Sequence, residues 1–142
     1  MRQLLAVALS GIMVFTPVSE TNNLITGNNI IVVNDIGTTE KTSELSISSK
    51  TAVCKSSCRK GAEPIKSITA VQTLEKRYGN GRYSAVANAN WSKTVNAELL
   101  SMRNSISLLS VGTYRLKTVF TVKYKDGRSE TVTVYSTETT VK

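Results

Sequence analysis

From Leu45 to the carboxyl end of the chain, apolar and polar residues alternate with a period of two, and glycine or asparagine turns interrupt the alternation. Successive side chains of a β-strand point to opposite faces, so this pattern predicts strands with one buried and one exposed face. About seven such segments follow one another, a number typical of a two-sheet antiparallel sandwich. They lie at residues 45–47, 52–54, 68–75, 83–89, 100–106, 112–123 and 131–135. The sequence therefore predicts an all-β sandwich.

The last two predicted strands form a hairpin whose register decides which side chains are buried. Asp126 and Gly127 supply the turn, and a two-residue loop would put Phe120 opposite Thr133. A three-residue loop, with Gly127 in the left-handed conformation, puts Phe120 opposite Val132 instead. We predict the second register because it gathers the apolar side chains on one face, and a slip by one residue would expose them. That face holds Tyr114, Leu116, Phe120, Val132 and Val134.

The first 19 residues have the organisation of a signal peptide. Arg2 supplies a positive charge, and residues 4–15 form an apolar stretch that is shorter than the roughly 20 residues of a membrane-spanning helix. Pro17 and small residues follow, and cleavage after Ser19 is the simplest prediction. We therefore expect residues 1–19 to be removed and the mature protein to be secreted, without a transmembrane helix. An uncleaved membrane anchor and a buried strand are the alternatives.

Residues 20–42 are expected to form a polar leader before the folded domain. Threonine, asparagine and glycine surround a single short apolar patch at residues 30–33. A segment of this composition offers little surface to bury, so we expect the leader to be flexible or loosely docked. The sandwich domain is then predicted to cover residues 43–142.

The absence of histidine restricts the chemistry that the chain can perform. Histidine is the most frequent general base, a common zinc ligand and the usual partner in a catalytic triad. The carboxylates are scattered, and the glycine turn at residues 79–81 lies between strands, without the helix that a phosphate-binding loop needs. We therefore expect no enzyme activity, no catalytic residue, no cofactor and no metal site.

Cys54 and Cys58 are the two cysteines of the chain. If the segment is an extended strand, they stand about 13 Å apart at ~3.3 Å per residue, which is beyond the reach of a disulfide bond. We interpret Cys54 as a small buried apolar side chain and Cys58 as a residue near a strand end. A disulfide bond, which would require a turn at residues 55–57, is the alternative.

The formal net charge is +8, from 18 Lys+Arg against 10 Asp+Glu, and such an excess attracts polyanions. Basic residues lie on the outer face of the predicted hairpin and at its turn, and these are the candidate polyanion-binding residues: Arg115, Lys117, Lys123, Lys125 and Arg128. Anionic cell-wall polymers or lipid head groups are the expected partners. Nucleic acid is not expected, because few aromatic residues accompany the basic ones. The alternative is that the lysines only keep the sheet soluble.

Several short motifs follow one another in a fixed order between Leu45 and Ser136. They are AVC at residues 52–54, QTLEK at 72–76 before a glycine turn, WS at 91–92, GTYRLK at 112–117, FTV at 120–122 and SET at 129–131. Together they resemble small secreted, largely uncharacterised proteins of Gram-positive bacteria, although Tyr83 stands where that family has a tryptophan. More broadly, the predicted fold resembles immunoglobulin and fibronectin type III sandwiches.

The resemblance implies a structural role for Tyr114, because such sandwiches have a tyrosine in the second-to-last strand that bonds back to the chain at a corner. Trp91 and Gly127 are the other residues with an expected structural role. The resemblance supplies no catalytic residue. It therefore agrees with a secreted protein that acts by binding.

The sequence thus predicts a secreted, non-catalytic binding or interaction module at the bacterial cell surface, which contacts anionic envelope polymers through its basic face or engages an unknown protein partner. One alternative is a basic secreted effector, such as a toxin or antimicrobial protein, that acts on anionic membranes. Another is a ligand or inhibitor of a host protein that presents the loops near residues 79–81 and 126–127.

Overall fold

A computed structural model of the chain describes residues 14–15, 21–26, 29–34, 40–107 and 110–142, with side chains in the last two ranges. All of the regular secondary structure in these ranges is β-strand. The strands are β1 (Val14–Phe15), β2 (Thr21–Thr26), β3 (Asn29–Asn34), β4 (Glu40–Ser48), β5 (Thr51–Arg59), β6 (Ile65–Arg77), β7 (Tyr83–Val95), β8 (Leu99–Ser107), β9 (Gly112–Tyr124), β10 (Ser129–Tyr135) and β11 (Thr139–Val141).

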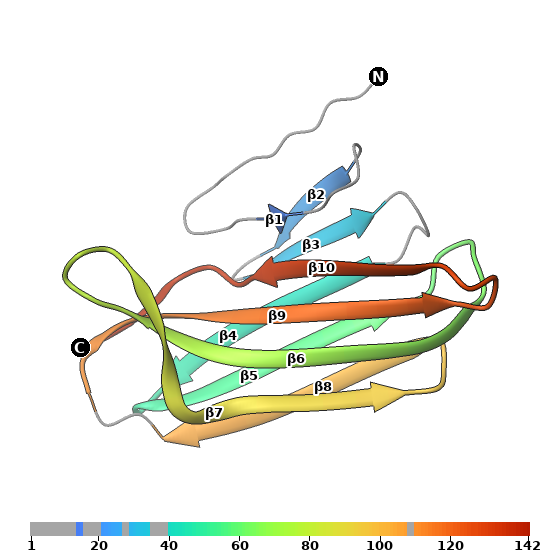
Figure 1. Cartoon of the computed structure of the whole chain (residues 1–142). Coiled ribbons are helices and arrows are strands. Elements are labelled where there is room, and N and C mark those ends of the chain that lie inside the picture. The colour runs from blue at the N-terminus through green and yellow to red at the C-terminus, as the bar shows by residue number, and fades with distance from the viewer. Residues whose placement is uncertain (1–13, 16–20, 27–28, 35–39, 108–109) are drawn as a thin grey trace.

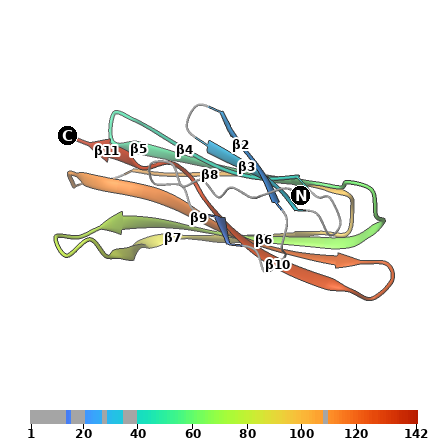
Figure 2. The same ribbon diagram turned by 90° about the horizontal axis from the view of Figure 1, so that it is seen from above.

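The strands form two antiparallel sheets that pack face to face (Figures 1 and 2). The six-stranded sheet has the order β1-β10-β9-β6-β7, and β11 also pairs with β9. The five-stranded sheet has the order β2-β3-β4-β5-β8. The prediction of an all-β, two-sheet sandwich is confirmed, and the seven segments predicted from the alternation correspond to β4 through β10.

The hairpin of β9 and β10 has the predicted register. Phe120 pairs with Val132, and Thr118 pairs with Val134. Gly127 has a φ of 96°, in the left-handed region, and its N–H donates to the carbonyl of Tyr124 at 3.0 Å. The predicted apolar face is also confirmed, because the following side chains are all buried: Tyr114, Leu116, Phe120, Val132 and Val134.

Strand β7 is longer than the alternation predicted. We expected the strand to end before Trp91, whereas β7 includes Trp91 and runs to Val95. Asn88 has a φ of 62°, in the left-handed region, and the pairing of β6 with β7 shifts between Thr73 and Glu75. A bulge of this kind adds residues to one strand without adding partners. The bulge interrupts the alternation of apolar and polar residues, so the alternation does not indicate that the strand continues past it.

The five-stranded sheet extends into the segment that we expected to be a polar leader. Strands β2 and β3 pair with each other, and β3 pairs with β4, which begins at Glu40. Residues 20, 27–28 and 35–39 of the expected leader lie outside the described residues. Residues 1–13 and 16–19 of the expected signal peptide also lie outside the described residues. The other two residues of that segment, Val14 and Phe15, form β1 and pair with β10. The signal peptide stays a prediction.

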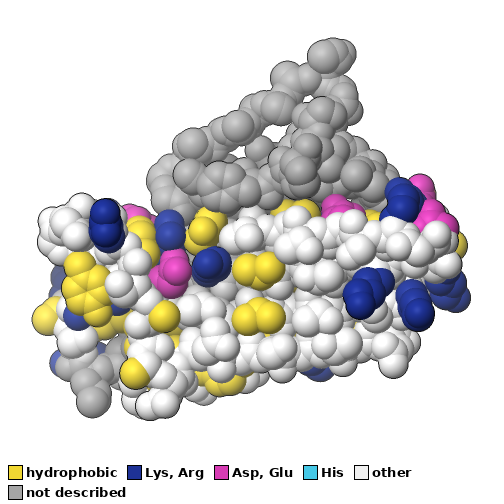
Figure 3. All heavy atoms as spheres, viewed as in Figure 1, with side chains coloured by type: hydrophobic (Ala, Val, Ile, Leu, Met, Phe, Trp, Pro, Cys, Tyr) yellow, Lys and Arg dark blue, Asp and Glu magenta, His cyan; other side chains and the backbone are white. Residues whose placement is uncertain are grey.

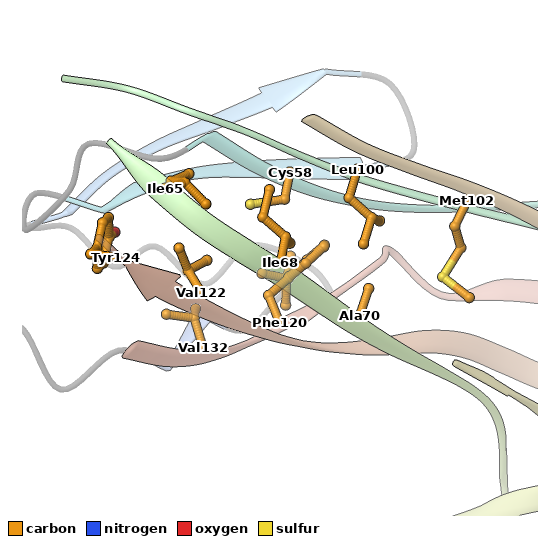
Figure 4. Packing of buried hydrophobic residues seen from close by; sticks show 11 residues of the cluster. Cys58, Ile65, Ile68, Ala70, Leu100, Met102, Phe120, Val122, Tyr124 and Val132 are labelled. Carbon is orange, nitrogen blue, oxygen red and sulfur yellow. The ribbon is translucent and has the colours of Figure 1, made fainter. Parts of the chain in front are cut away.

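Two clusters of buried apolar side chains lie between the sheets. The first contains Cys58, Ile65, Ile68, Ala70, Leu100, Met102, Phe120, Val122, Tyr124, Val132 and Val134 (Figure 4). The second contains Leu45, Ala52, Cys54, Leu74, Ala89, Tyr114, Leu116 and Val141. Trp91 is partly buried and packs against both clusters. Removal of this apolar surface from water is the main force that holds the sheets together.

A layer of hydrogen-bonded polar side chains separates the two clusters. Gln72 Nε2 donates to Ser56 Oγ at 2.8 Å, and Ser56 Oγ lies 2.7 Å from Thr118 Oγ1. Thr118 Oγ1 lies 2.9 Å from Ser43 Oγ, and Asn104 Nδ2 donates to Gln72 Oε1 at 2.8 Å. The five residues come from both sheets. Because buried polar groups are costly unless they are hydrogen-bonded, the layer fixes how β4, β5 and β8 face β6 and β9.

A buried ion pair joins β4 to β10. Lys41 Nζ lies 3.6 Å from Glu130 Oε2, and the two side chains are 0% and 7% exposed. The hydroxyl of Tyr124 donates to the other carboxylate oxygen of Glu130. Lys41 belongs to the segment that we expected to be a leader, so the structure places a core residue of the sandwich there. Buried charges are tolerated only when they are paired, and this pair therefore constrains how the two strands meet.

Tyr114 bonds back to the chain just before β9. Its hydroxyl donates to the backbone carbonyl of Ser110 at 2.9 Å, and the hydroxyl of Ser110 lies 3.1 Å away. The ring of Tyr114 is buried in the second apolar cluster. The hydroxyl thus ties the loop before β9 to a ring that is fixed in the core.

Replacement of Tyr114 by phenylalanine is expected to lower the free energy of unfolding by about 1 kcal/mol, because the ring stays in place while the hydrogen bond to Ser110 is lost. Urea unfolding followed by circular dichroism measures the change. Tyr78→Phe is the matched control, since Tyr78 is 50% exposed and should change stability by less than about 0.5 kcal/mol. Equal effects of the two substitutions would contradict the role of the Tyr114 hydroxyl.

Candidate binding surfaces

The five basic residues predicted to bind polyanions lie in different environments. Arg115 Nε donates to Glu75 Oε1 at 2.8 Å, and its guanidinium lies over the rings of Tyr83 and Tyr135, at 3.7 and 4.1 Å from their centroids. The carboxylate balances the charge and the aromatic contacts fix the plane of the guanidinium. Arg115 therefore joins neighbouring strands of the six-stranded sheet.

Arg128 is also balanced by carboxylates. Its Nε donates to Asp126 Oδ2 at 2.7 Å, and its Nη2 contacts Glu63. Its guanidinium carbon lies 4.9 Å from the centroid of the Tyr124 ring. These contacts stabilise the β9–β10 turn and leave Arg128 with little free positive charge.

Lys117, Lys123 and Lys125 have no ion pair with any residue that the structure describes. Lys123 and Lys125 are exposed at the turn end of β9, whereas Lys117 is half-buried near the middle of the strand. Lys66, which the sequence analysis did not single out, joins them. It lies between Ile65 and Ser67 on β6, which pair with the last two residues of β9. We call Lys66, Lys123 and Lys125 the hairpin-end lysines.

The middle of this sheet face carries few charged side chains (Figure 3). Four threonines form one row across β10, β9, β6 and β7, in the order Thr131, Thr121, Thr69 and Thr94. Thr69 Oγ1 lies 2.8 Å from Thr94 Oγ1, and Thr121 Oγ1 lies 3.3 Å from Thr131 Oγ1. A polyanion on this side would therefore meet exposed lysines at the end of the sheet, whereas Lys117 near the middle of β9 is half-buried.

Ion pairs neutralise nearly all of the described carboxylates but leave many of the described lysines and arginines unpaired. Among the residues with described side chains, every carboxylate except that of Glu44 takes part in a salt bridge. Lysines and arginines outnumber these carboxylates, so many of them have no acidic partner among the residues with described side chains. They are Lys50, Lys55, Lys66, Lys76, Arg82, Lys93, Arg103, Lys117, Lys123, Lys125 and Lys142. The excess of positive charge is thus on the surface and is available to an anionic partner.

Cys54 and Cys58 are free and buried. Both lie on the inward face of β5, which is extended from Thr51 to Arg59, so the predicted interpretation is confirmed. Burial raises the pKa of each thiol to about 12. Both thiols are therefore protonated at neutral pH and are poor nucleophiles.

No group of three or more His, Cys, Asp or Glu side chains that could hold a metal ion occurs among the described residues. In the same residues, no helix has the length and hydrophobicity that a crossing of the lipid bilayer requires.

A groove of about 480 Å³ opens where the edge strands β7 and β8 face each other. Its lining from β7 is Asn90, Trp91, Ser92 and Lys93, and its lining from β8 is Ser101, Met102, Arg103 and Asn104. The lining contains the sole tryptophan of the chain, two cations and no carboxylate. Sequence reasoning missed this groove because β7 and β8 are edges of different sheets, which only the packing of the sheets brings together.

A second groove of about 300 Å³ lies on the outer face of the five-stranded sheet. It shares Ser101, Met102 and Arg103 with the first groove, so the two adjoin at β8. Lys55 adds a cation next to Arg103, with which it pairs across β5 and β8. Glu44, on the other side of Lys55, adds a carboxylate.

Sequence comparisons assign no family to the chain: no protein-family model matches it, and no curated protein shows significant similarity.

Proposed function

We propose that the protein is a secreted, non-catalytic binding module of the bacterial cell surface, held there by anionic polymers of the envelope. The hairpin-end lysines supply the main contact. The observation that supports this proposal best is the distribution of charge, since nearly all described carboxylates are paired while many exposed cations are not. Unpaired surface cations attract polyanions over distances comparable to the Debye length, which is about 8–10 Å at physiological salt.

We further propose that the sandwich is of the immunoglobulin or fibronectin type III kind, as in the secreted Gram-positive proteins that the motifs resemble. Strands β4, β5 and β8 form neighbours in one sheet, and β10, β9 and β6 form neighbours in the other. This arrangement matches the A-B-E and G-F-C orders of immunoglobulin domains, with β7 beside the C position. The hydrogen bond from Tyr114 to Ser110 lies where such domains have their tyrosine corner.

Sedimentation of the purified protein with isolated bacterial cell walls tests the proposal. The double variant Lys123→Glu/Lys125→Glu is expected to bind at least about tenfold more weakly, and ~0.5 M salt should release the unaltered protein. Lys50→Glu/Lys142→Glu is the matched control, because it changes the net charge equally at other exposed positions. It should bind within about threefold of the unaltered protein.

Retention that is insensitive to salt and to the Lys123→Glu/Lys125→Glu change would contradict an electrostatic attachment. Release of dye from vesicles of anionic lipid by micromolar protein, without binding to walls, would also overturn the proposal and favour an effector that acts on membranes.

A further inference from the structure

We propose that the groove between β7 and β8 binds an anionic saccharide, with a sugar ring against Trp91 and the acidic group of the sugar facing Arg103 and Lys93. The inference rests on the proposed function only in that envelope polymers would supply the ligand. It concerns a different surface from the hairpin-end lysines, so the two can be tested separately.

The lining of the groove fits a ligand that is both hydroxylated and negatively charged. Asn90 and Asn104 carry amides and Ser92 and Ser101 carry hydroxyls, which are groups that exchange hydrogen bonds with sugar hydroxyls. Lys93 and Arg103 supply positive charge, and no carboxylate in the lining opposes it. A neutral saccharide would leave the two cations without a balancing negative charge, so the complementary ligand is an acidic one.

Trp91 provides a fixed platform for a sugar ring. The residue lies opposite Gln72 on the inward face of β7 and packs against both apolar clusters, while the rest of its surface lines the groove. The C–H groups of a sugar ring pack well against the face of an indole. A flexible polyol phosphate chain has no such ring, and the position of Trp91 therefore favours a saccharide.

Three polar residues of the groove are already held in place. Asn90 Nδ2 donates to Thr73 Oγ1 at 2.7 Å. Asn104 Nδ2 donates to Gln72 Oε1 at 2.8 Å and thereby forms the end of the polar layer between the clusters. Lys93 Nζ donates to the backbone carbonyl of Ser101 at 2.8 Å and so links β7 to β8. A site whose groups are ordered before binding loses less conformational entropy when the ligand arrives.

The second groove extends the site over the edge of β8. Arg103 lines both grooves, and Lys55 lies next to Arg103 in the second one. Glu44 lies beyond Lys55 and opposes negative charge there. A saccharide of several units is thus expected to bind more tightly than a single unit, up to the length that reaches Glu44.

Titration with tetragalacturonic acid tests the inference, and the fluorescence of the sole tryptophan reports occupancy directly. At low salt, the tetramer should change the Trp91 emission in a saturable way, and galacturonic acid monomer should bind at least about tenfold more weakly. The neutral tetramer maltotetraose should give no saturable change. Arg103→Glu should weaken binding of the tetramer at least about tenfold, and Lys123→Glu, with the same change of charge, should leave it within about threefold.

Trp91→Phe keeps an aromatic ring in the core and is followed by calorimetry instead of fluorescence. It should weaken binding of the tetramer at least about threefold, while circular dichroism confirms that the variant is folded.

Three outcomes would overturn the inference while leaving the proposed function intact, provided that the protein still binds walls through the hairpin-end lysines. They are a lack of response to tetragalacturonic acid, an equal response of the Arg103→Glu and Lys123→Glu variants, and a saturable response to poly(glycerol phosphate) in place of the saccharide. Conversely, binding of the tetramer that depends on Arg103 would support the groove even if the protein did not sediment with walls.

Discussion

Replacement of Glu130 by alanine is expected to lower the free energy of unfolding by about 3–5 kcal/mol, which is the usual effect of removing one partner of a buried ion pair. Lys41 is fully buried, and its ammonium lies 3.6 Å from Glu130 Oε2. The substitution removes that carboxylate and also the acceptor of the Tyr124 hydroxyl. The Lys41 ammonium keeps the cost of its burial but loses the negative charge of Glu130. Urea unfolding followed by circular dichroism measures the loss.

Two controls separate the buried ion pair from a general effect of removing a carboxylate. Glu98→Ala breaks the exposed pair of Lys60 and Glu98, whose atoms lie 3.4 Å apart, and should change stability by no more than about 1 kcal/mol. The double variant Lys41→Met/Glu130→Gln removes both charges and should be more stable than Glu130→Ala. A Glu130→Ala protein as stable as Glu98→Ala would contradict the buried pair between β4 and β10.

Replacement of Phe120 by alanine is the second large change, with an expected loss of about 3–5 kcal/mol. Phe120 is fully buried in the first apolar cluster, opposite Val132 of the neighbouring strand (Figure 4). The smaller side chain leaves a cavity between the sheets and loses the transfer free energy of the ring. Unfolding by urea measures the effect, and the m-value should stay constant if only the folded state is destabilised.

Thr121→Ala is the matched control for Phe120→Ala, because Thr121 is the next residue of β9 and faces outward in the threonine row. It loses only the contact with the hydroxyl of Thr131 and should change stability by less than about 1 kcal/mol. A larger loss for Thr121→Ala than for Phe120→Ala would mean that the two faces of β9 are exchanged.

The parts of the fold that depend on local patterns could be predicted from the sequence. The register of β9 and β10 follows from a period of two and from one glycine that tolerates a positive φ. The burial of Cys54 and the place of Cys58 near the end of β5 follow from the same alternation. In each case residues that are close in the sequence determine the register or the buried face, because the strands are joined by a short turn or lie within one alternating segment.

The parts that depend on contacts between distant residues could not be predicted. Arg115 has no acidic residue in its own strand, and its partner Glu75 lies 40 positions away. Lys41 stands in a polar segment, yet it is buried and paired with Glu130 of β10, which is distant in the sequence. The groove at Trp91 likewise exists only because edge strands of two different sheets come together. A single sequence gives no signal for such pairings.

The most direct test of the proposed attachment to anionic envelope polymers compares two preparations of the same cell walls, one intact and one from which the phosphate-containing and acidic polymers have been extracted. We predict that the protein sediments with the intact walls at low salt, and that extraction reduces its retention at least about tenfold. Equal retention on both preparations would contradict it, because the unpaired cations of the surface would then have no part in holding the protein.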